Sequence, residues 1–497
     1  MIGLHPAAEI RAAEAPLLAS LPDGALMQRA AAGLATVCLR LLGRSYGARV
    51  GLLVGAGNNG GDALFAGARL AARGARVTAV LLDPARAHAA GLSALRAAGG
   101  RSVPPGAAGP VLDRADLVLD GIVGIGGTGG LRPEAAALVE RAAAGPALMV
   151  AVDVPSGVDA DTGAVEGAAF PATHTVTFGA VKPGLVVGEG RGHAGEVHLV
   201  DIGLGPHLPR PSAGRFTDAD AAARLPVPDA DDDKYSQGVV GVVAGSATYP
   251  GAGVLCTGAA LRTRPGLVRY AGTAAEGVRA AWPEAIVTEG RPADAGRVQA
   301  WVVGPGTGTD DDARSVLAEV LGTDLPVLVD ADALTLLARE PELVRQRAAP
   351  TVLTPHDREF ARFGSAGGGG AGGGTVGDDR IGAARRLAGD LGVVVLLKGE
   401  ATVVAGPDGT AFVNATGTPW LATAGTGDVL SGIAGALLAT GLPAAEAAAT
   451  AAHVHGRAGQ VAAANGPLIA GDLVRHLPAA IDRVRGARSG GLPDSEP

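Results

Sequence analysis

Short runs of apolar residues alternate with longer amphipathic stretches along most of this chain. In the first half the apolar runs are rich in valine, leucine and alanine, and they cover residues 49–54, 75–82, 116–120, 147–154, 174–178 and 197–200. Continuous apolar runs of this length are typical of strands that are buried on both faces of a parallel sheet. The pattern therefore predicts an α/β fold in which helices cover both faces of the sheet.

The second half repeats the same alternation after a break. Its apolar runs cover residues 239–245, 267–271, 300–304, 326–330, 351–355, 393–398 and 402–405. Between the halves the pattern gives way to prolines and then to an acidic run that ends at Asp233. We therefore expect a first domain over residues 1–205, a linker over 206–233 with a short helix at 218–225, a second domain over 234–480, and a disordered tail over 481–497.

The N-terminal residues 1–46 predict helices with no chemical role of their own. Over residues 25–42 the helical spacing of the apolar residues predicts one face packed in the core. These residues are Leu26, Ala30, Gly33, Leu34, Val37 and Leu41.

Composition narrows the function classes. The chain of 497 residues has a formal net charge of −8 and only 3% aromatic residues, which argues against a nucleic-acid partner. Its two cysteines, Cys38 and Cys256, are too few for a disulfide framework or a zinc site. The sequence has neither a signal-peptide pattern nor a long uncharged apolar run, so we expect a cytoplasmic protein without a membrane segment. Its alanine-rich helices lead us to expect a homo-oligomer.

Glycine-rich and polar loops follow the expected strands of the first half. The loop from Gly55 to Ala63 lies between a strand and a helix, which is the arrangement of a pyrophosphate site, and Asn58, Asn59 and Asp62 add side-chain oxygens. Similar loops follow the next strands at residues 120–130, 153–159 and 179–184. Because loops at the carboxyl ends of parallel strands share one edge of the sheet, we expect them to form one site.

The second half carries its clearest chemical signal in residues 417–432. Gly425 and Gly427 allow a sharp turn, and a helix is expected to start near Thr426, so that backbone amides and the positive end of the helix point toward one ligand. Asp428 lies in the first helical turn, where a carboxylate can accept a proton beside a bound anion. Further turns follow the strands at residues 245–253, 304–310, 330–334, 354–356 and 398–402.

The first half resembles the N-terminal domain of the YjeF family, the NAD(P)H-hydrate epimerases. The resemblance covers roughly residues 9–205 and rests on N-N-G-G-D, D-x-x-x-G-x-G, V-D-V-P-S-G-V-D and F-G-A-x-K-P-G, which occur in family order. It implies a Rossmann-like domain that interconverts the R and S hydrates of NADH and NADPH (NADHX and NADPHX) and binds K⁺. One departure is Ala63, which stands where the family usually has glycine.

The resemblance also implies roles for individual residues. Those implied for K⁺ are Asn59, Asp120 and Ser156. Those expected around the cofactor are Asn58, Asn59, Gly60, Gly61, Asp62, Gly124, Ile125, Gly126, Gly127, Thr128, Gly129 and Gly130. Asp153 would contact the damaged nicotinamide ring and act as the acid or base, with Lys182 as a possible second catalytic group.

The second half resembles the ribokinase-like domain of the same family, the ADP-dependent NAD(P)H-hydrate dehydratase. The match covers about residues 234–475 and includes K-Y-S-x-G and G-T-P-x-L-A-T-A-G-T-G-D-V-L-S-G. It implies that ADP phosphorylates the hydroxyl of the S-hydrate, and that loss of phosphate then restores NADH or NADPH and leaves AMP. Mg²⁺ is expected on the diphosphate.

Site residues of the second half follow from the same resemblance. Contacts with the hydrate are implied for Ala252, Gly306, His356 and Asp428. Contacts with the AMP portion are implied for Lys398, Gly399, Glu400, Ala401, Thr402 and Gly427. Asp428 would be the catalytic base. Two departures are Asp357 and Arg358 after the histidine, and a glycine-rich insert at residues 367–374.

Two other interpretations remain open at this point. The second half could be an ordinary ATP-dependent small-molecule kinase joined to a nucleotide-binding module, because such kinases share the glycine turn and its aspartate. The first half could also be a scaffold without turnover. Retention of Asn59, Asp120, Asp153 and Ser156 argues against a scaffold.

Overall fold

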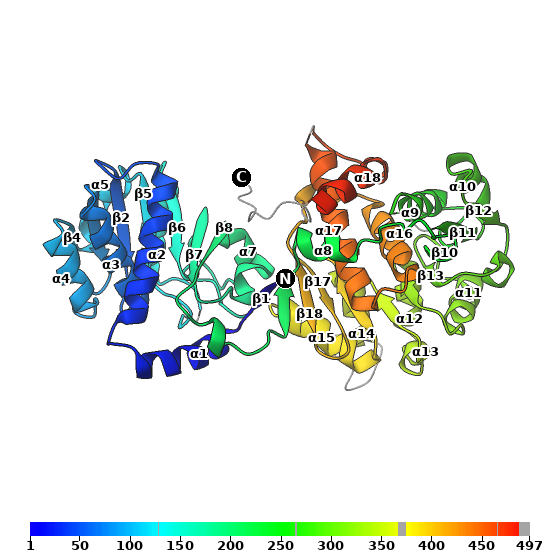
Figure 1. Ribbon diagram of the computed structural model, residues 1–497, viewed down its shortest axis with the longest axis horizontal. Helices are drawn as coiled ribbons and strands as arrows, with labels where there is room; N and C mark the ends of the chain where they lie inside the picture. The colour runs from blue at the N-terminus through cyan, green and yellow to red at the C-terminus, as the bar shows by residue number, and fades with distance from the viewer. Residues whose placement is uncertain (128, 264–265, 366–373, 465, 487–497) are drawn as a thin grey trace. The chain divides into compact units, whose positions relative to one another are not determined.

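The protein divides into two compact units. The computed structural model describes residues 1–127, 129–263, 266–365, 374–464 and 466–486. Residues Gly3–Ser212 form one unit, and Met1–Ile2 together with the chain from Ala213 onward form the other. We call them the N-terminal unit and the C-terminal unit, and Figure 1 shows the elements of each.

The N-terminal unit is built on a parallel sheet. Its strands, in spatial order, are β4 (Arg101–Val103), β3 (Arg76–Leu81), β2 (Arg49–Val54), β5 (Leu117–Gly121), β6 (Leu148–Val152), β7 (His174–Phe178) and β8 (Glu196–Val200). The chain runs outward from β2 to β4, returns to β5 beside β2, and then runs outward on the other side. The strand order therefore reverses between β2 and β5, and ligands bind at such a reversal in doubly wound sheets.

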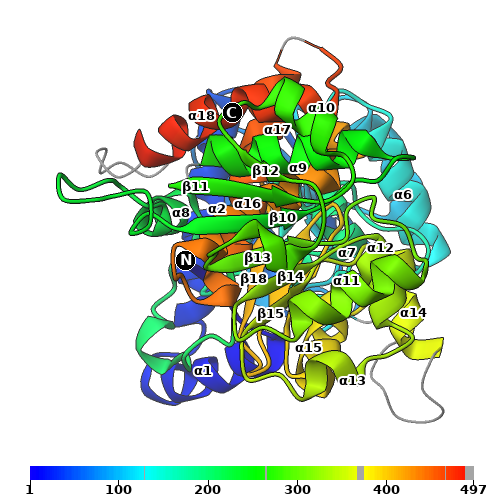
Figure 2. The same ribbon diagram turned by 90° about the vertical axis from the view of Figure 1, so that its right-hand side faces the viewer.

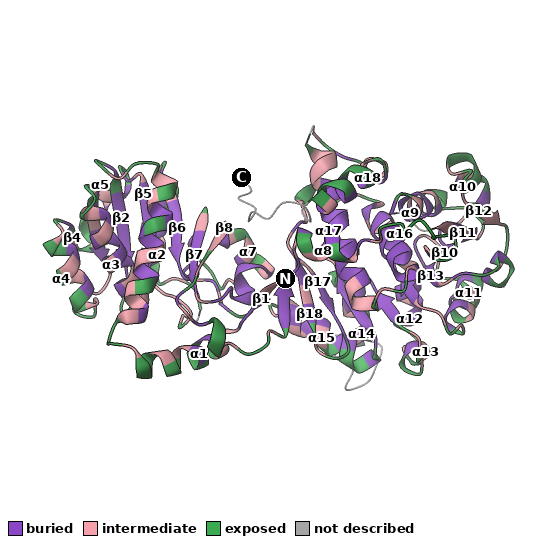
Figure 3. Ribbon diagram, in the orientation of Figure 1, coloured by how far each residue is buried: buried purple, intermediate pink, exposed green. Residues whose placement is uncertain are grey.

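Helices cover both faces of this sheet. They are α1 (Ala7–Ser20), α2 (Ala25–Leu42), α3 (Asn58–Ala71), α4 (Ala89–Ala97), α5 (Gly109–Leu112), α6 (Pro133–Ala143) and α7 (Gly188–Ala194). One core joins α2 and α3 to strand residues such as Leu52, and another joins α5 and α6 to residues such as Val118. Figure 3 shows the strands buried between these layers, which confirms the expected α/β fold.

Helix α2 is long and apolar enough to cross a membrane by length and composition alone. In this structure its apolar face is part of a protein core: Ala31, Leu34 and Cys38 are fully buried together with Leu52 of β2. Packing in the N-terminal unit thus accounts for its composition.

The C-terminal unit contains a mixed sheet. Its strands, in spatial order, are β1 (Ile2–Leu4, of which only Ile2 belongs to this unit), β9 (Ala213–Arg215), β18 (Ala411–Asn414), β17 (Thr402–Ala405), β16 (Val394–Leu397), β15 (Thr351–Leu353), β14 (Val327–Val329), β13 (Ala300–Val303), β10 (Val239–Val243), β11 (Leu267–Ala271) and β12 (Ile286–Thr288). From β12 to β16 all pairings are parallel, whereas β16, β17 and β18 pair antiparallel. Here the strand order reverses between β10 and β13.

Helices again form layers on the two faces of the sheet. They are α8 (Asp218–Arg224), α9 (Pro250–Thr263), α10 (Ala275–Ala281), α11 (Asp311–Leu321), α12 (Asp332–Leu337), α13 (Glu342–Arg345), α14 (Asp357–Ser365), α15 (Arg380–Leu391), α16 (Thr426–Ala439), α17 (Ala444–Ala463) and α18 (Ala470–Gly486). Figure 2 shows α9, α16 and α17 on one side of the strands, and α11 to α15 on the other.

The domain boundary differs from the expected linker at 206–233. Strand β9 pairs with β18, and Phe216, Ala221 and Ala222 are buried in the core of the C-terminal unit. The expected short helix is present as α8, but it is a packed element of the C-terminal unit. The expectation failed because β9 has only three residues and is surrounded by prolines and aspartates, a composition typical of linkers.

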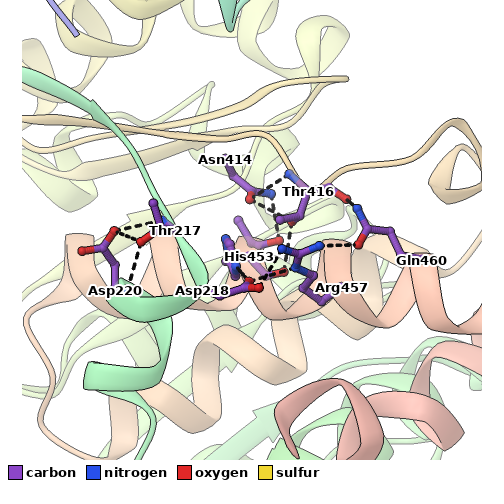
Figure 4. Close-up of polar contacts among 9 residues, drawn as sticks. Thr217, Asp218, Asp220, Asn414, Thr416, His453, Arg457 and Gln460 are labelled. Carbon is purple, nitrogen blue, oxygen red and sulfur yellow. Dashed lines mark hydrogen bonds and ion pairs between the residues drawn. The ribbon is translucent and has the colours of Figure 1, made fainter. Parts of the chain in front are cut away.

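A buried ionic network holds α8 against α17, as Figure 4 shows. Arg457 donates two hydrogen bonds to the Asp218 carboxylate, at 2.8 and 2.7 Å, and His453 makes a short hydrogen bond to the same group. Burial of this carboxylate raises its pKa, but the hydrogen bonds from His453 and Arg457 outweigh burial and lower the pKa to about 2. Thr217 and Asp220 complete a capping box at the start of α8.

The C-terminal end also differs from the expected tail at 481–497. Helix α18 continues to Gly486, because Ile481 and Val484 extend the buried stripe formed by Leu473 and Leu477. The rest of the expected tail, residues 487–497, lies outside the described residues, as does the glycine-rich insert except for Gly374.

Candidate active sites

The first candidate site lies where the strand order of the N-terminal sheet reverses. Helix α3 begins at Asn58, whereas we expected a loop up to Ala63. Gly60 lies in the first turn of α3. A Cβ at this position would lie 2.5 Å from the Gly55 carbonyl oxygen, so a side chain would not fit. Gly60 therefore allows close packing of the helix on the strand loop. Ala63 is a buried helical residue, so its departure from the family pattern is accommodated.

Asp120 and Ser156 form a buried pair of oxygen-bearing side chains. Ser156 donates to both oxygens of the Asp120 carboxylate, from its backbone amide at 2.8 Å and from its hydroxyl at 2.7 Å. Asp120 is fully buried and makes no ion pair within the described chain, and burial raises its pKa to about 6. The Nδ2 atom of Asn59 is also buried without a hydrogen-bond partner in the described part of the unit.

Asp153 and Lys182 form a buried ion pair at the ends of β6 and β7. Lys182 Nζ lies 2.5 Å from Asp153 Oδ1 and also donates to Thr177 Oγ1 at 2.9 Å and the Phe178 carbonyl oxygen at 3.1 Å. Asp153 has a φ of 70°, a left-handed conformation that is uncommon for a residue with a side chain and that clusters at functional sites. Asp153 is thus held in a strained backbone conformation next to the buried ammonium group of Lys182.

The loop after β5 reaches this ion pair. The Ile125 amide donates to Asp153 Oδ2 at 3.3 Å. A Cβ on Gly124 would lie 3.0 Å from Asn59 Oδ1 and 3.3 Å from Asp153 Oδ2, so Gly124 adjoins both side chains. Gly129 and Gly130 lie instead beside Glu166, and Thr128 is outside the described residues.

Helix α1 contributes a residue that sequence reasoning missed. Burial raises the pKa of Glu14, and the charge of Asp153 raises it further. The pKa of Asp62 is raised well above its ordinary value by burial, with added repulsion from Asp153 and Glu14. Arg11 of the same helix donates to the Ile125 carbonyl oxygen at 2.8 Å, which ties α1 to the loop. The negative charge of Asp153 thus acts on both Glu14 and Asp62.

The second candidate site lies in the C-terminal unit and includes a cavity of about 1040 Å³. This volume is in the range of ligand pockets. The expected residues that line it are His356, Lys398, Gly399, Glu400, Thr402 and Gly427. Ala401 is buried and does not line the cavity. A separate cavity of about 720 Å³, beside α13, contains none of the expected residues.

Besides Ala401, three expected residues lie outside the lining of this cavity: Ala252, Gly306 and Asp428. Asp428 follows the lining residue Gly427 directly. Ala252 and Gly306 adjoin each other at the reversal between β10 and β13, because a Cβ on Gly306 would lie 2.9 Å from the Ala252 Cβ. The structure therefore brings Ala252 and Gly306 together, as the switch-point rule requires.

Asp428 stands at the start of α16, which begins at Thr426 as expected. Gly425 before it has a φ of 86°, which favours glycine. Burial raises the pKa of Asp428 to about 7, with repulsion from Asp330 as the second cause, while Lys398 acts in the opposite direction. The amides of Gly427 and Asp428 lie in the first helical turn, where no carbonyl of the helix can accept them. A neutral-range base thus adjoins a natural anion site.

Asp330 is held as an anion beside Asp428. Lys398 Nζ donates to its Oδ1 at 2.9 Å, and Ser431 Oγ donates to its Oδ2 at 2.7 Å. Burial would raise the pKa of Asp330, but the charge and hydrogen bond of Lys398 outweigh it and lower the pKa. Glu359 lies 3.6 Å from Lys398 as a second carboxylate partner.

His356 is oriented by its own helix start. Its Nδ1 accepts hydrogen bonds from the amides of Arg358 and Glu359, at 3.1 and 3.2 Å, so the ring proton resides on Nε2. Asp357, one of the two departures, forms an ion pair with Arg380, which also donates to the Lys398 carbonyl oxygen at 2.9 Å. Through Arg380, Asp357 thus connects the turn at His356 to the turn at Lys398.

Helix α17 supplies cavity residues that the sequence did not reveal. His455 is buried, and its Nε2 donates to the Thr426 carbonyl oxygen at 2.9 Å. Burial lowers the pKa of His455 to about 4, so the ring is neutral. Asn414 of β18 also lines the cavity. His455 shares an alanine-rich helix with His453, which pairs with Asp218 instead, so the sequence carries no signal that separates a cavity histidine from a packing one.

Comparisons with known proteins match both halves of the chain. Residues 240–482 match the family described as NAD(P)H-hydrate dehydratase, and residues 23–184 match the YjeF-related protein N-terminus. The bifunctional NAD(P)H-hydrate repair enzyme Nnr of Mycobacterium leprae is 53% identical over 96% of this chain and 98% of its own length. The enzyme of the same name from Mycobacterium tuberculosis is 56% identical over 88% of this chain and 90% of its own length.

A solved structure also matches the C-terminal half. It is an ADP/ATP-dependent NAD(P)H-hydrate dehydratase from Bacillus subtilis, co-crystallised with ATP and Mg²⁺. The identity is 29% with a TM-score of 0.49, and the match covers 54% of this chain and 98% of that one.

Proposed function

We propose a division of labour between the two units, starting from the premise that this chain belongs to the family of bifunctional NAD(P)H-hydrate repair enzymes. The N-terminal unit epimerises the R and S hydrates of NADH and NADPH. The C-terminal unit dehydrates the S-hydrate at the expense of ADP. The observation that carries the second assignment is Asp428, a carboxyl with a pKa of about 7 at the start of a helix beside a nucleotide-sized cavity.

In the dehydratase unit, Asp428 takes the proton of the substrate hydroxyl. The oxygen then attacks the β-phosphorus of ADP, and AMP leaves. Amides in the first turn of α16 hold the phosphoryl oxygens, which is the usual source of catalysis in phosphoryl transfer. Phosphate is a far better leaving group than hydroxide, so it departs together with a ring proton and the dihydronicotinamide is restored. Each turnover converts one hydrate and ADP into NAD(P)H, AMP and phosphate.

The remaining residues of this unit bind the reactants. Lys398, Gly399, Glu400, Ala401, Thr402 and Gly427 hold the AMP portion, and Ala252, Gly306 and His356 contact the hydrate. The AMP assignment is supported by the cavity, which all of these residues except Ala401 line. The hydrate assignment is supported by Ala252 and Gly306, which adjoin each other.

Mg²⁺, when bound together with ADP, would supply positive charge to the diphosphate. Among the described residues, no group of three histidine, cysteine or acidic ligands converges in this cavity. Asp330 is already engaged by Lys398 and Ser431. An ion held by phosphate oxygens and water, which is how Mg²⁺ usually binds, is consistent with both observations.

In the epimerase unit, Asp153 exchanges the proton that accompanies inversion at the hydroxyl-bearing carbon, and Lys182 serves as the second acid–base group. Their contact at 2.5 Å supports this pairing because a proton can pass between hydrogen-bonded groups. The residues 58–62 and 124–130 surround the nucleotide. The position of Gly124 beside the Asn59 and Asp153 side chains supports this role for the start of the segment 124–130.

K⁺ is assigned to Asn59, Asp120 and Ser156. Oxygen atoms are the ligands that hard cations prefer, and Asp120 is a buried carboxylate without an ion-pair partner among the described residues, so the donor set fits. When bound, the ion supplies a fixed positive charge for the anionic substrate.

Location and assembly stay predictions. Both cysteines are buried free thiols, which is consistent with the reducing cytoplasm. We keep the expectation of a homo-oligomer on the composition of its helices alone.

The test is recovery of the dihydronicotinamide absorbance from a mixture of R and S NADPH hydrate, with ADP and Mg²⁺ added. We expect full recovery with the wild-type chain. Asp428→Asn should abolish recovery, whereas Asp153→Asn should stop it at the S fraction. If the wild type formed a stable phosphoester from ATP and released no NADPH, the ordinary kinase would replace this proposal.

A further inference from the structure

Two histidines and a glutamate meet on the outer strands of the N-terminal sheet, apart from the residues assigned to epimerisation. His174 is the first residue of β7, and Glu196 and His198 belong to the edge strand β8. The strands pair in parallel, with His174 opposite Glu196 and Val176 opposite His198. Because side chains alternate along a strand, Glu196 and His198 share one face of the sheet.

The separations of the polar atoms match those around a metal ion. His174 Nδ1 lies 3.1 Å from His198 Nε2 and 3.4 Å from Glu196 Oε2, and His198 Nε2 lies 3.6 Å from the other carboxylate oxygen, Glu196 Oε1. Zinc bonds of about 2.0–2.1 Å in tetrahedral geometry separate neighbouring ligand atoms by roughly 3.3 Å. A cation could therefore contact all three side chains with little rearrangement.

Solvent can reach the three side chains. The side chains of His174, His198 and Glu196 are 17%, 22% and 50% exposed, so solvent reaches the cluster while the sheet fixes its backbone. The charged groups that face His198 are Glu196, His174 and Arg40 of α2.

We propose that His174, Glu196 and His198 form a binding site for a divalent transition metal ion such as Zn²⁺, with the remaining position taken by water. Two imidazoles and one carboxylate favour such ions over Mg²⁺ or Ca²⁺, which prefer oxygen ligands. The site joins β8, an edge strand, to β7. The far end of β7 carries Thr177 and Phe178, which contact Lys182. A metal ion at this site would tie β8 to the strand that leads to the residues around Lys182.

Metal binding is measured on the full-length chain after chelator treatment and removal of the chelator. Co²⁺ is titrated and followed by its visible absorption, and Zn²⁺ is then used to displace it. We expect one Co²⁺ per chain with a spectrum of nitrogen and oxygen ligation. His174→Gln, His198→Gln and Glu196→Gln should each weaken binding by at least about tenfold. His207→Gln, which changes an exposed histidine of the same unit, is the matched control and should bind as the wild type does.

A second readout separates metal binding from folding. Zn²⁺ should raise the calorimetric melting temperature of the N-terminal unit in the wild type and in His207→Gln, but not in the three ligand variants. Melting curves without metal show whether each variant folds, and Glu196→Gln, whose side chain is half exposed, serves if a histidine variant does not fold. Undiminished Co²⁺ binding by a His174→Gln/His198→Gln double variant, or no binding by the wild type, overturns the proposal. Epimerisation without added transition metal is measured separately, so failure of the repair assignment would leave this result intact.

Discussion

Replacement of Asp428 by asparagine should remove dehydratase activity and stabilise the C-terminal unit at the same time. Asparagine keeps the size of the side chain but cannot accept a proton. Loss of a general base lowers rates by about 10²- to 10⁴-fold. In the wild type, kcat/KM should rise with pH through about 7, because the base must be deprotonated to act. The variant should have no such rise.

The stability change follows from the same pKa. Burial and Asp330 raise the pKa of Asp428 from 3.8 to about 7, so the folded state favours the protonated acid. The stability that protonation provides is fully present below pH 3.8 and is lost as pH rises through about 7. A shift of roughly three units corresponds to at most about 4 kcal/mol, and we halve this to about 2 kcal/mol because water reaches the cavity. Asparagine escapes this loss, so the variant should be more stable than the wild type above pH about 7, and the gain should shrink toward pH about 4.

Tryptophan fluorescence during urea unfolding measures this change selectively. All three tryptophans, Trp282, Trp301 and Trp420, belong to the C-terminal unit. Midpoints are compared at pH about 5 and about 8.5, without nucleotide. Asp408→Asn is the matched control, because Asp408 is an exposed aspartate whose pKa is lowered by hydrogen bonds from Thr410. Activity above about a tenth of the wild-type rate in Asp428→Asn, or a stability gain that does not change with pH, would refute the reasoning.

Three further substitutions test other parts of the structure. Lys182→Met should stop epimerisation and lower the unfolding free energy of the N-terminal unit by about 3–5 kcal/mol, because it leaves the Asp153 carboxylate buried without its cation. Calorimetry measures this loss, and an unchanged melting transition would contradict it. Asp120 has a pKa raised to about 6 by burial, so the wild type should lose stability as pH rises through about 6. K⁺, but not choline, should restore this stability in melting curves of the wild type and have no effect on Asp120→Asn. Asp218 has a pKa of about 2, so its ion pair stabilises the fold above pH about 4 and this contribution is lost as pH falls through about 2. Asp218→Asn should cost about 2 kcal/mol at neutral pH by tryptophan fluorescence, and equal losses at pH about 2 and about 7 would disprove this origin.

Much of the fold could be predicted because long buried strands have an unmistakable sequence pattern. Strands β2 and β7 begin and end where the apolar runs do. The short strands β4, β9 and β12 were missed because three residues are too few to display a periodic pattern. The start of α3 was misplaced because Gly60 and Gly61 are typical of loops, whereas here they permit close helix packing.

The candidate sites were predictable to the extent that their residues follow strands. Asp120, Asp153 and Lys398 come directly after or at the end of strands, and the switch-point rule places such residues together. Glu14 and His455 lie on helices that pack over the sites, and a polar residue on a helix usually faces water. The positions of Glu14 and His455 near the sites become visible only once α1 and α17 are packed in the fold. The pattern of apolar and polar residues in these helices does not predict that packing.

Each unit has a buried lysine beside a carboxylate, but the two lysines have different roles. Each role suits the proton transfer that we propose for its unit. In the N-terminal unit Lys182 contacts Asp153 directly, so the proposed acid and base are adjacent and a proton can move in either direction, as epimerisation requires. In the C-terminal unit Lys398 instead contacts Asp330 and keeps that carboxylate ionised. The fixed charge of Asp330 then raises the pKa of its neighbour Asp428, which suits a base that removes one hydroxyl proton. Asp330 is therefore a positioning residue, and Asp330→Asn should lower the pH at which kcat/KM rises without preventing ADP binding.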